Sequence, residues 1–216
     1  MEICAMSDLH GTQFFTRPGD LLVIAGDLTA TGSVQELSEM QGYLSGLDFK
    51  KKIIIGGNHD IALANATFQF DPEIVTYLND SGCTYAGYKI WGSPWVSSFK
   101  GMNPKCKAFT MPKTQLKKMW DLIPEDTDIL VTHNPPLGHL DGVMKAGRYE
   151  EQGCPFLLKR IKKIFPKFHL FGHIHEGGGK FSLEKNRLSG KQIELRNCAM
   201  FNPIINMFNR PTYITI

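Results

Sequence analysis

Short apolar runs separated by polar clusters mark the beginning of the chain. The runs at 1–7, 21–25 and 53–55 predict β-strands, and the entirely apolar second run is typical of a strand buried on both faces. Each run ends at a polar cluster that contains aspartate or histidine, at 8–11, 26–27 and 56–60. The pattern therefore places polar side chains at the carboxyl ends of three successive strands.

A helix is predicted between the second and third of these strands. Ser33 and Glu36 have the spacing of a capping box, in which each side chain bonds to the backbone N–H of the other residue. Apolar residues then recur with a roughly helical period as far as Leu47. We therefore expect a helix that begins just after Ser33.

The rest of the chain predicts further strands and helices in a less regular order. Helices are expected over 71–78, 112–123 and 155–165. Strands are expected over 88–91, 129–131, 168–171, 192–197 and 212–216. Strands that alternate with helices indicate an α/β fold, and because no repeat or linker interrupts residues 1–216 we expect a single domain.

Composition and length indicate an ordinary soluble protein. Of the 216 residues, 42% are hydrophobic and 21% charged, and no apolar run is long enough to span a bilayer. The amino terminus lacks the features of a secretory signal. The five cysteines are scattered without a C-x-x-C pair, which favours reduced thiols and a cytoplasmic location.

The charge balance argues against a nucleic-acid partner. The net charge is +3, from 24 basic and 21 acidic residues, which is too mild to indicate such binding. The local basic runs at 50–52 and 159–163 are typical of solvated strand edges or helix faces. We therefore expect a small-molecule ligand and no membrane contact.

Histidines concentrate where the predicted strands end. Of seven histidines, five lie in such clusters: His10, His59, His133, His173 and His175. In open α/β sheets, ligands bind outside the carboxyl ends of the strands. The sequence therefore predicts a functional site built from these clusters.

The chemistry of the clustered side chains suits transition metals. Residues two apart on an extended backbone project to the same side, and carboxylate, amide and imidazole ligands without thiolate fit Mn, Fe, Ni or Zn better than Ca. Seven ligands are too many for one tetrahedral ion and suit two ions that share a bridging carboxylate. The candidate ligands are Asp8, His10, Asp27, Asn58, His133, His173 and His175.

These motifs, in this order, resemble those of the calcineurin-like metallophosphoesterases. The matching residues run from 8 to 175, and the stretches 132–138 and 171–177 are most similar to the small metallophosphoesterase-domain proteins first known from vertebrate brain. Some members of that branch have glycine at the first histidine of the last motif, whereas this chain keeps His173. The resemblance implies a four-layer α/β/β/α sandwich of two mixed sheets flanked by helices, with metals at the strand carboxyl ends.

The same resemblance implies how the ligands divide between two divalent ions. One ion is expected on Asp8, His10, Asp27 and His175, and the other on Asp27, Asn58, His133 and His173. Mn is the ion we expect to support activity in an assay, with Fe, Zn or Ni as alternatives. The implied reaction is hydrolysis of a phosphodiester, for example a small nucleotide-like one, by a hydroxide that bridges the ions.

Two neighbouring residues are expected to act in catalysis without binding metal. By resemblance, His59 faces the phosphate, and Asp60 orients the His59 imidazole. Asn58, His59 and Asn134 are the expected substrate contacts. For His59 the alternatives are a further metal ligand or a structural turn residue, and His139 and Asp141 are candidates for supporting positions.

Other functions compatible with the motifs differ in substrate or in activity. A phosphomonoesterase is the nearest alternative, and a non-catalytic scaffold of the same fold is a further one. Between 92 and 112, three lysines form a candidate rim that could steer anions toward the site. These lysines are Lys100, Lys105 and Lys107.

Overall fold

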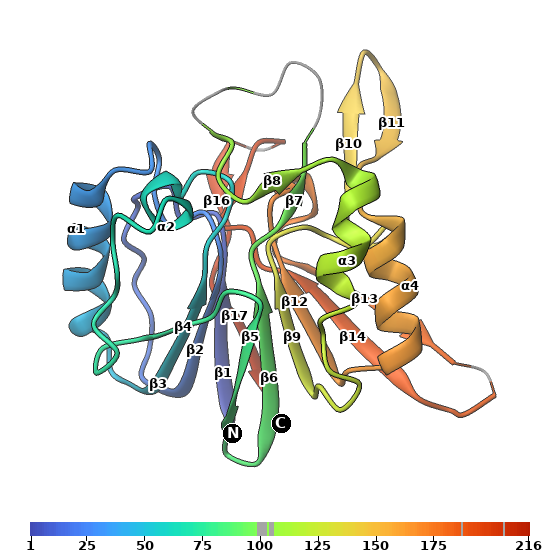
Figure 1. Cartoon of the computed structure of the whole chain (residues 1–216), viewed down its shortest axis with the longest axis horizontal. Coiled ribbons are helices and arrows are strands. Elements are labelled where there is room, and N and C mark those ends of the chain that lie inside the picture. Colours follow the sequence, from blue (N-terminus) through green and yellow to red (C-terminus); the bar gives the residue numbers. More distant parts are fainter. Residues whose placement is uncertain (99–102, 104–105, 187, 205) are drawn as a thin grey trace.

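Two β-sheets packed face to face, with helices on both outer faces, form the body of the molecule (Figure 1). This computed structural model describes residues 1–98, 103, 106–186, 188–204 and 206–216, so Lys100 and Lys105 of the predicted rim lie outside the described residues. The predicted four-layer α/β/β/α sandwich is confirmed.

The first sheet has the order β17-β1-β2-β3-β4. Strands β1 (Glu2–Met6), β2 (Gly19–Ala25) and β3 (Phe49–Ile55) are parallel to one another. The short strand β4 (Thr76–Tyr77) continues the parallel set at one edge, and β17 (Thr212–Thr215) is antiparallel to β1 at the other. The carboxyl ends of β1, β2 and β3 therefore meet at one end of the sheet.

The second sheet is a parallel set with an antiparallel strand at each edge. Its order is β13-β14-β12-β9-β6-β5, and β14, β12, β9 and β6 are parallel. The edge strands β13 and β5 are antiparallel to their neighbours. The bounds are β5 Ser81–Tyr85, β6 Tyr88–Ser93, β9 Ile129–Thr132, β12 Phe168–Phe171, β13 Lys180–Lys185 and β14 Gln192–Asn197.

Alternate residues of the parallel strands divide between two cores. Leu21 and Val23 of β2 point into the space between the sheets, where they pack with Val131 of β9 and other apolar residues of the second sheet. Leu22 and Ile24 point to the outer face of the first sheet. Burial on both faces is the reason that the runs at 21–25 and 53–55 are apolar throughout.

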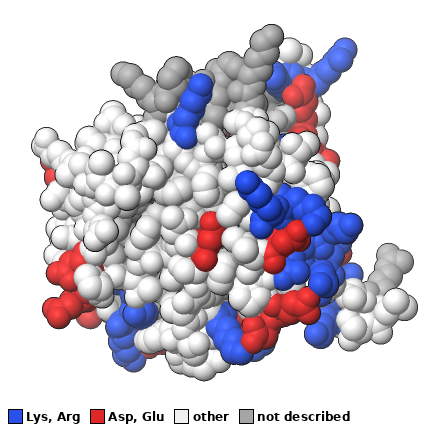
Figure 2. All heavy atoms as spheres, in the orientation of Figure 1, with Lys and Arg blue, Asp and Glu red and all other residues white. Residues whose placement is uncertain are grey.

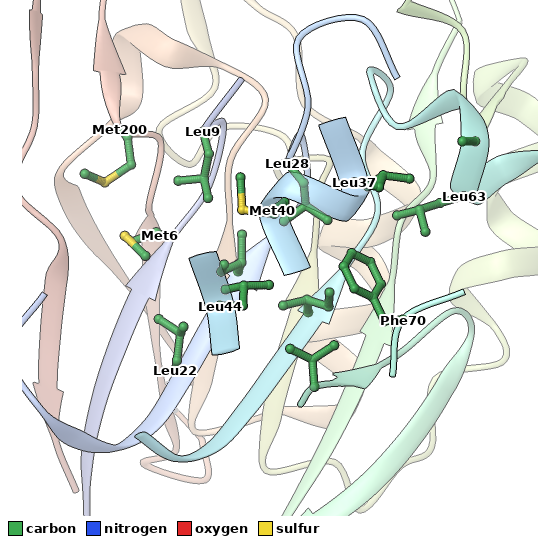
Figure 3. Close-up of a cluster of buried hydrophobic side chains, with 14 of the residues drawn as sticks. Met6, Leu9, Leu22, Leu28, Leu37, Met40, Leu44, Leu63, Phe70 and Met200 are labelled. Carbon is green, nitrogen blue, oxygen red and sulfur yellow. The ribbon is translucent and has the colours of Figure 1, made fainter. Parts of the chain in front are cut away.

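The helices cover the outer faces of the two sheets. Helix α1 (Val34–Ser45) buries Leu37, Met40 and Leu44 against the first sheet (Figure 3). Each such leucine contributes roughly 1.5–3 kcal/mol through removal of its side chain from water. On the other side, α3 (Leu116–Trp120) and α4 (Pro155–Ile164) cover the second sheet with Trp120, Leu157 and Ile161 among their buried residues.

The helix predicted over 71–78 is wrong. The chain forms a turn at 72–74 and then the edge strand β4, which pairs with Ile53 and Ile54 of β3. Pairing with an existing sheet satisfies the backbone groups of this segment and buries Val75 and Leu78. Helical preference, which depends on the local sequence alone, does not include these contacts. The helix predicted over 112–123 is shorter, with a 3₁₀ turn η2 (Lys113–Gln115) before α3.

Several short elements gather at the end of the sandwich where the parallel strands finish (Figure 1). The hairpin of β10 and β11 projects from this end. The others are the helix α2, the 3₁₀ turn η3 and two small strand pairs. Their bounds are α2 Ile61–Ala64, β7 Val96–Ser97, β8 Thr110–Met111, β10 Gly142–Lys145, β11 Arg148–Glu151, η3 His175–Gly177, β15 Phe201–Asn202 and β16 Met207–Phe208.

Basic side chains on the side of α3 and α4 are interspersed with acidic ones (Figure 2). Lys163 of α4 lies 2.6 Å from a Glu125 oxygen, and Lys162 lies 3.2 Å from a Glu184 oxygen. The basic run at 159–163 is thus part of a solvated helix face with local ion pairs. No helix among the described residues is both long and apolar enough to cross a bilayer.

The capping box at the start of α1 also orders the loop that precedes it. Ser33 Oγ accepts from the Glu36 N–H at 3.2 Å, and Glu36 accepts from the Ser33 N–H at 3.0 Å. The same carboxylate accepts from the backbone N–H groups of Ala30 at 3.0 Å and Thr31 at 3.1 Å. Partial burial alone would raise the pKa of Glu36, but hydrogen bonds from Thr31 and Ser33 lower it to about 2.

We predict that Glu36→Gln lowers the free energy of unfolding at pH 7 by about 1 kcal/mol, the typical contribution of a helix cap. The folded pKa lies below the ordinary value of 4.5, so this contribution is fully present above pH 4.5 and is lost as the pH falls toward 2. Urea unfolding from pH 7 to pH 3 measures both effects. Glu39→Gln is the control, because that carboxylate bonds only a side chain on the exposed helix face. An equal loss in both variants would contradict the role of Glu36.

Candidate metal centre

Five strand ends from the two sheets bring the predicted ligands to one place. Asp8 and His10 follow β1, and Asp27 follows β2. Asn58, His133, and the pair His173 and His175 follow β3, β9 and β12 respectively. Because the two sheets pack face to face with these carboxyl ends together, residues 165 positions apart, such as His10 and His175, come into contact.

The donor atoms form three overlapping groups. In each group the ligand atoms lie within 4.8 Å of one another. Asp27 belongs to one group with His10 and to another with His133, so its carboxylate lies between two potential ion sites. The groups are Asp8 with His10 and His175, His10 with Asp27 and His59, and Asp8 with Asp27 and His133.

The first group contains facing nitrogen atoms. The Nε2 atoms of His10 and His175 lie 3.4 Å apart, and His175 Nε2 lies 3.1 Å from Asp8 Oδ1. Two imidazole nitrogens and a carboxylate oxygen that point at one another need a proton or a metal ion between them, since lone pairs alone would repel. This donor set fits a divalent transition metal.

The donor atoms around His133 converge in the same way on the other side of Asp27. His133 Nε2 lies 3.1 Å from Asn58 Oδ1 and 3.3 Å from Asp27 Oδ2, while His133 Nδ1 donates to the Ala25 carbonyl at 2.8 Å. The carbonyl fixes the orientation of the ring and leaves Nε2 directed toward the two oxygens. Three ligand atoms again converge on one position.

His173 differs from the other predicted ligands. Its ring does not belong to any of the three groups and packs 5.1 Å from the ring of His133, measured between centroids. Its backbone N–H donates to both Asp8 oxygens, at 3.1 and 3.0 Å. Burial, and next the neighbouring His133, lower the pKa of His173 to about 4, so the ring is neutral and retains a lone pair for a ligand.

Two almost completely buried carboxylates stay ionised in this site. Burial alone would raise the pKa of Asp8, but the hydrogen bond to His175 and the charge of His133 hold it below its usual range. Burial likewise opposes ionisation of Asp27, and His133 overcomes that effect. In return the pKa of His133 is raised to about 9, against the effect of its own burial. Both carboxylates are therefore stabilised by nearby positive charge, which a bound metal ion would also supply.

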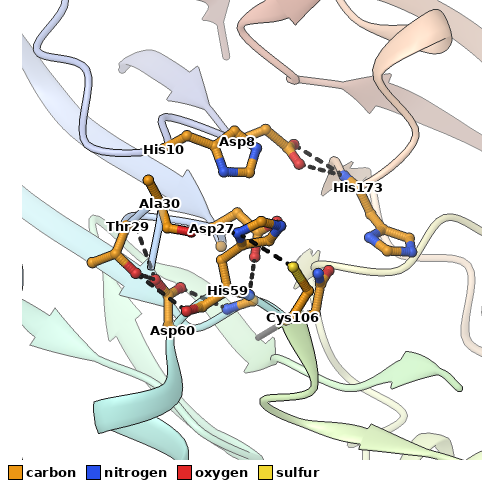
Figure 4. A network of polar contacts seen from close by, with 12 residues as sticks. Asp8, His10, Asp27, Thr29, Ala30, His59, Asp60, Cys106 and His173 are labelled. Atoms are coloured by element: carbon orange, nitrogen blue, oxygen red, sulfur yellow. Dashed lines mark hydrogen bonds and ion pairs between the residues drawn. The ribbon is translucent and has the colours of Figure 1, made fainter. Parts of the chain in front are cut away.

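His59 lies beside the predicted ligands with its ring held by a carbonyl (Figure 4). Its Nδ1 donates to the Ala30 carbonyl at 2.8 Å, and its backbone N–H donates to Asp27 Oδ1 at 2.8 Å. The other ring nitrogen, Nε2, lies 3.9 Å from Asp27 Oδ2. His59 is therefore positioned at the edge of the centre with Nε2 on the side of the Asp27 carboxylate. The Cys106 thiol lies 3.8 Å from Nδ1.

Asp60 does not orient the His59 ring, contrary to the expectation from sequence. Its fully buried carboxylate accepts from the N–H groups of Gly57 at 2.8 Å, Thr29 at 3.0 Å and Leu28 at 3.2 Å, and from Thr29 Oγ1 at 2.7 Å. Asp60 thus ties the loop after β2 to the loop after β3. The Ala30 carbonyl, which lies in the first of these loops, orients the ring instead.

The backbone turns sharply at four of the predicted ligands. Asp8, His10, Asp27 and His173 have positive φ angles of 57°, 46°, 53° and 67°. Left-handed backbone costs a residue with a side chain roughly 1–2 kcal/mol, although aspartate and histidine tolerate it better than most. Conformations of this kind gather at functional sites, where surrounding contacts hold them.

Glycines beside the ligands let the loops approach the carboxylates closely. A Cβ atom on Gly57 would collide with the Asp27 carboxylate and would lie 2.9 Å from His133 Nε2. A Cβ atom on Gly172 would collide with the Asp8 carboxylate and the Ser7 side chain. These positions accept only glycine if the ligands keep their places.

A cavity of about 610 Å³ opens beside His173. Asn134, a predicted substrate contact, lies in its wall and is 1% exposed. Its amide Nδ2 donates to the Pro135 carbonyl, and its Oδ1 accepts from the Ser97 N–H at 3.4 Å. Asn134 therefore shapes the wall, and its contacts are largely used within the protein.

The two other residues considered from sequence lie outside the ligand groups. His139 bonds Ser182 and Glu184 of β13. Asp141 is buried and accepts from the N–H groups of Gly138 and Gly153, so it holds the base of the β10–β11 hairpin. Both residues support the fold around the site.

Sequence reasoning missed two groups that position the site. The Ala30 carbonyl is one, and no residue type signals a backbone oxygen. Asn197 is the other: its Nδ2 donates to the carbonyls of Ile174 at 2.8 Å and Leu140 at 3.1 Å, which supports the loop that carries His173 and His175. The signal available in the sequence was an asparagine at the end of the strand predicted over 192–197.

Comparisons with known proteins agree with this geometry. The family described as calcineurin-like phosphoesterase matches residues 1–177. Metallophosphoesterase domain-containing protein 1 of Homo sapiens is 37% identical over 203 residues, which cover 81% of this chain and 60% of that protein. UPF0046 protein T07D4.2 of Caenorhabditis elegans is 31% identical over 243 residues, covering 96% of this chain and 58% of that protein. The resemblance inferred from the motifs is confirmed, and the chain spans about three fifths of the length of these relatives.

A solved structure shares the fold at much lower sequence identity. The crystal structure of TT1561 of Thermus thermophilus has a TM-score of 0.57 and 16% identity, and the match covers 99% of this chain and 98% of that one. Similarity at this identity supports the arrangement of the layers.

We predict that Gly57→Ala lowers the content of bound divalent ion, because the added methyl group displaces Asp27 and His133. Ion content after dialysis against Mn²⁺, measured by mass spectrometry, tests this. Gly42→Ala is the matched control: Gly42 lies within α1 with open space around it, so alanine should stabilise the helix by roughly 0.5–1 kcal/mol. Equal ion content in the two variants would exclude the proposed crowding.

Proposed function

The chain belongs to the calcineurin-like phosphoesterase family, and on this premise we propose that it hydrolyses phosphate esters with two metal ions and prefers phosphodiesters. The observation that carries the proposal is the convergence of buried carboxylate, amide and imidazole donors on both sides of Asp27. No other part of the described chain gathers three or more potential metal ligands in this way.

We propose that Asp8, His10, Asp27 and His175 hold one ion, and that Asp27, Asn58, His133 and His173 hold the other. The position of Asp27 between the two groups supports its role as the shared ligand. Divalent ions bound there would neutralise the phosphate and lower the pKa of a coordinated water. Nitrogen and oxygen donors without thiolate support Mn, Fe, Zn or Ni.

The position of His59 supports a role in catalysis rather than in metal binding. Because Nδ1 donates to Ala30, a protonated ring would present its second N–H, on Nε2, toward the side of the ions. A phosphate held there would receive that hydrogen bond, and the departing oxygen could take the proton. Asp60 acts indirectly: its carboxylate positions the two loops that hold His59 and Ala30.

The surroundings of the centre support a diester as substrate, since a diester has two substituents to place. The cavity beside His173 lies on one side. On the other, Phe201 packs 5.9 Å from His175 and 5.8 Å from Phe208, which is 55% exposed. A doubly charged monoester would favour arginine forks, and no arginine is among the residues that line the cavity or form the ligand groups in the described chain.

The assay that tests this compares bis-p-nitrophenyl phosphate with p-nitrophenyl phosphate in the presence of Mn²⁺. We expect faster hydrolysis of the diester, complete inhibition by a chelator, and loss of both activity and bound ion in Asp27→Asn. His59→Ala should lower kcat by about 10²–10⁴-fold, the usual contribution of a proton donor, while ion content is unchanged.

His139→Ala is the control, because this histidine bonds β13 away from the ligand groups and should leave turnover intact. Faster turnover of the monoester would move the assignment to a phosphomonoesterase. Folded, ion-loaded protein with no turnover of either ester would favour the non-catalytic scaffold. Loss of bound ion in His59→Ala would make His59 a metal ligand.

Asp60→Ala separates positioning from chemistry. Removal of the carboxylate leaves three backbone donors in the buried loops without their acceptor, so we expect a loss of roughly 3 kcal/mol or more in the free energy of unfolding together with a lower kcat. His59→Ala should reduce kcat with little change in melting temperature. An Asp60→Ala variant with wild-type stability and reduced kcat would instead indicate a direct catalytic role.

We also propose a reducing compartment, the cytoplasm, as the location of the protein. The five cysteines are all free, and Cys4, Cys154 and Cys198 are buried. Burial raises the pKa of the Cys4 thiol to about 11 and that of Cys198 to about 12. Such thiols are inert core residues, which supports a protein that needs no disulfides.

A further inference from the structure

The cavity beside His173 is built from segments that are far apart in the sequence. Its walls come from the end of β7, the 3₁₀ turn η2, the β10–β11 hairpin and the loops after β9 and β12. A volume of about 610 Å³ is in the range of small-molecule sites. The lining residues are Ser97, Ser98, Lys113, Asn134, Val143, Lys145, Gln152, His173 and Ile174.

Among the described residues, the charged side chains that line the cavity are all cations. Lys113 and Lys145 face it, and no aspartate or glutamate is among the described residues of its wall. Neither lysine forms an ion pair with any described residue, whereas the nearby Lys117 pairs with Asp121. Two unpaired cations over one concave surface create a local positive potential that attracts an anion.

The cavity wall also offers an unused hydroxyl group. Ser97 Oγ is buried and has no hydrogen-bond partner among the described residues. Buried polar atoms are nearly always bonded, so an exception at the wall of a cavity indicates a ligand or a water molecule. Val143 and Ile174 add an apolar surface, which an inorganic ion would not use. Together these features fit an organic group that carries a negative charge.

We propose that this cavity binds the substituent of the substrate beyond the scissile phosphate, and that Lys113 and Lys145 select a substituent bearing a second anionic group, a carboxylate or a phosphate. This inference rests on the proposed function. Because His173 is common to the cavity wall and to the proposed ligand set, a phosphate at the metal centre would place one of its substituents here.

The experiment compares two chromogenic diesters that differ only in charge at the second substituent. These are p-nitrophenyl phenyl phosphate and p-nitrophenyl 3-carboxyphenyl phosphate, assayed with Mn²⁺. For the wild type we expect kcat/KM to be about tenfold higher for the carboxyphenyl ester, mainly through a lower KM, since two partly exposed charge pairs contribute modestly. The preference should fall with added salt because the pairs are screened.

The double variant Lys113→Gln/Lys145→Gln should lose the preference and keep its activity toward the phenyl ester. Lys118→Gln is the matched control, because Lys118 is an exposed lysine of α3 that does not line the cavity. A wild type that hydrolyses both esters at equal kcat/KM would overturn the inference. So would an equal loss of preference in the control.

A binding measurement separates failure of this inference from failure of the proposed function. If neither ester is hydrolysed, calorimetry with two phosphinates that have no ester bond, benzyl(methyl)phosphinate and (3-carboxybenzyl)(methyl)phosphinate, decides the matter. Tighter binding of the carboxylate analogue, lost in the double lysine variant, would support the cavity assignment without turnover. Equal binding of the two analogues would overturn it.

Discussion

Two buried carboxylates, Asp8 and Asp27, are the constraint on which the rest of the site depends. Each is almost fully removed from water at the junction of the two sheets, where an isolated anion would be strongly unfavourable. Imidazoles from the opposite sheet lower the pKa of both, and the two carboxylates in return raise the pKa of His133. The site therefore favours the binding of cations between these side chains.

The fold meets this demand because its parallel strands end together. β1, β2 and β3 deliver the carboxylates and Asn58, and β9 and β12 deliver imidazoles from the facing sheet. Left-handed backbone at Asp8 and Asp27 turns the chain within one residue, and Gly57 leaves room for the Asp27 carboxylate. The Asp60 carboxylate then fastens two of these loops to each other. Loop strain near the ligands is offset by the core that anchors the strands.

The sequence predicted the parts of the molecule whose signals are local. Apolar runs that end in aspartate or histidine predicted the strands and the polar residues that meet at their ends, because both signals lie in consecutive residues. The layered fold followed from the resemblance of these ordered motifs to a known family. Contacts that depend on packing could not be predicted in this way. The segment 71–78 is an edge strand because β3 offers it backbone partners, and the His59 ring is oriented by Ala30, whose carbonyl has no side-chain signature. The cavity wall, built from five separate segments, has no sequence pattern at all.

The energetic cost of the site argues for catalysis over a scaffold role. Replacing buried charged groups with apolar residues of similar size is often neutral or stabilising, so a scaffold of this fold would be at least as stable without the ionised pair Asp8 and Asp27. A scaffold would also gain nothing from the left-handed backbone at His10 and His173. These conformations cost free energy and add no contact to either core. His59 needs a further explanation, because both proposed ligand sets are complete without it, yet its ring is held by Ala30 with Nε2 3.9 Å from Asp27 Oδ2. The proposed hydrolysis of a phosphate ester accounts for all of these features together.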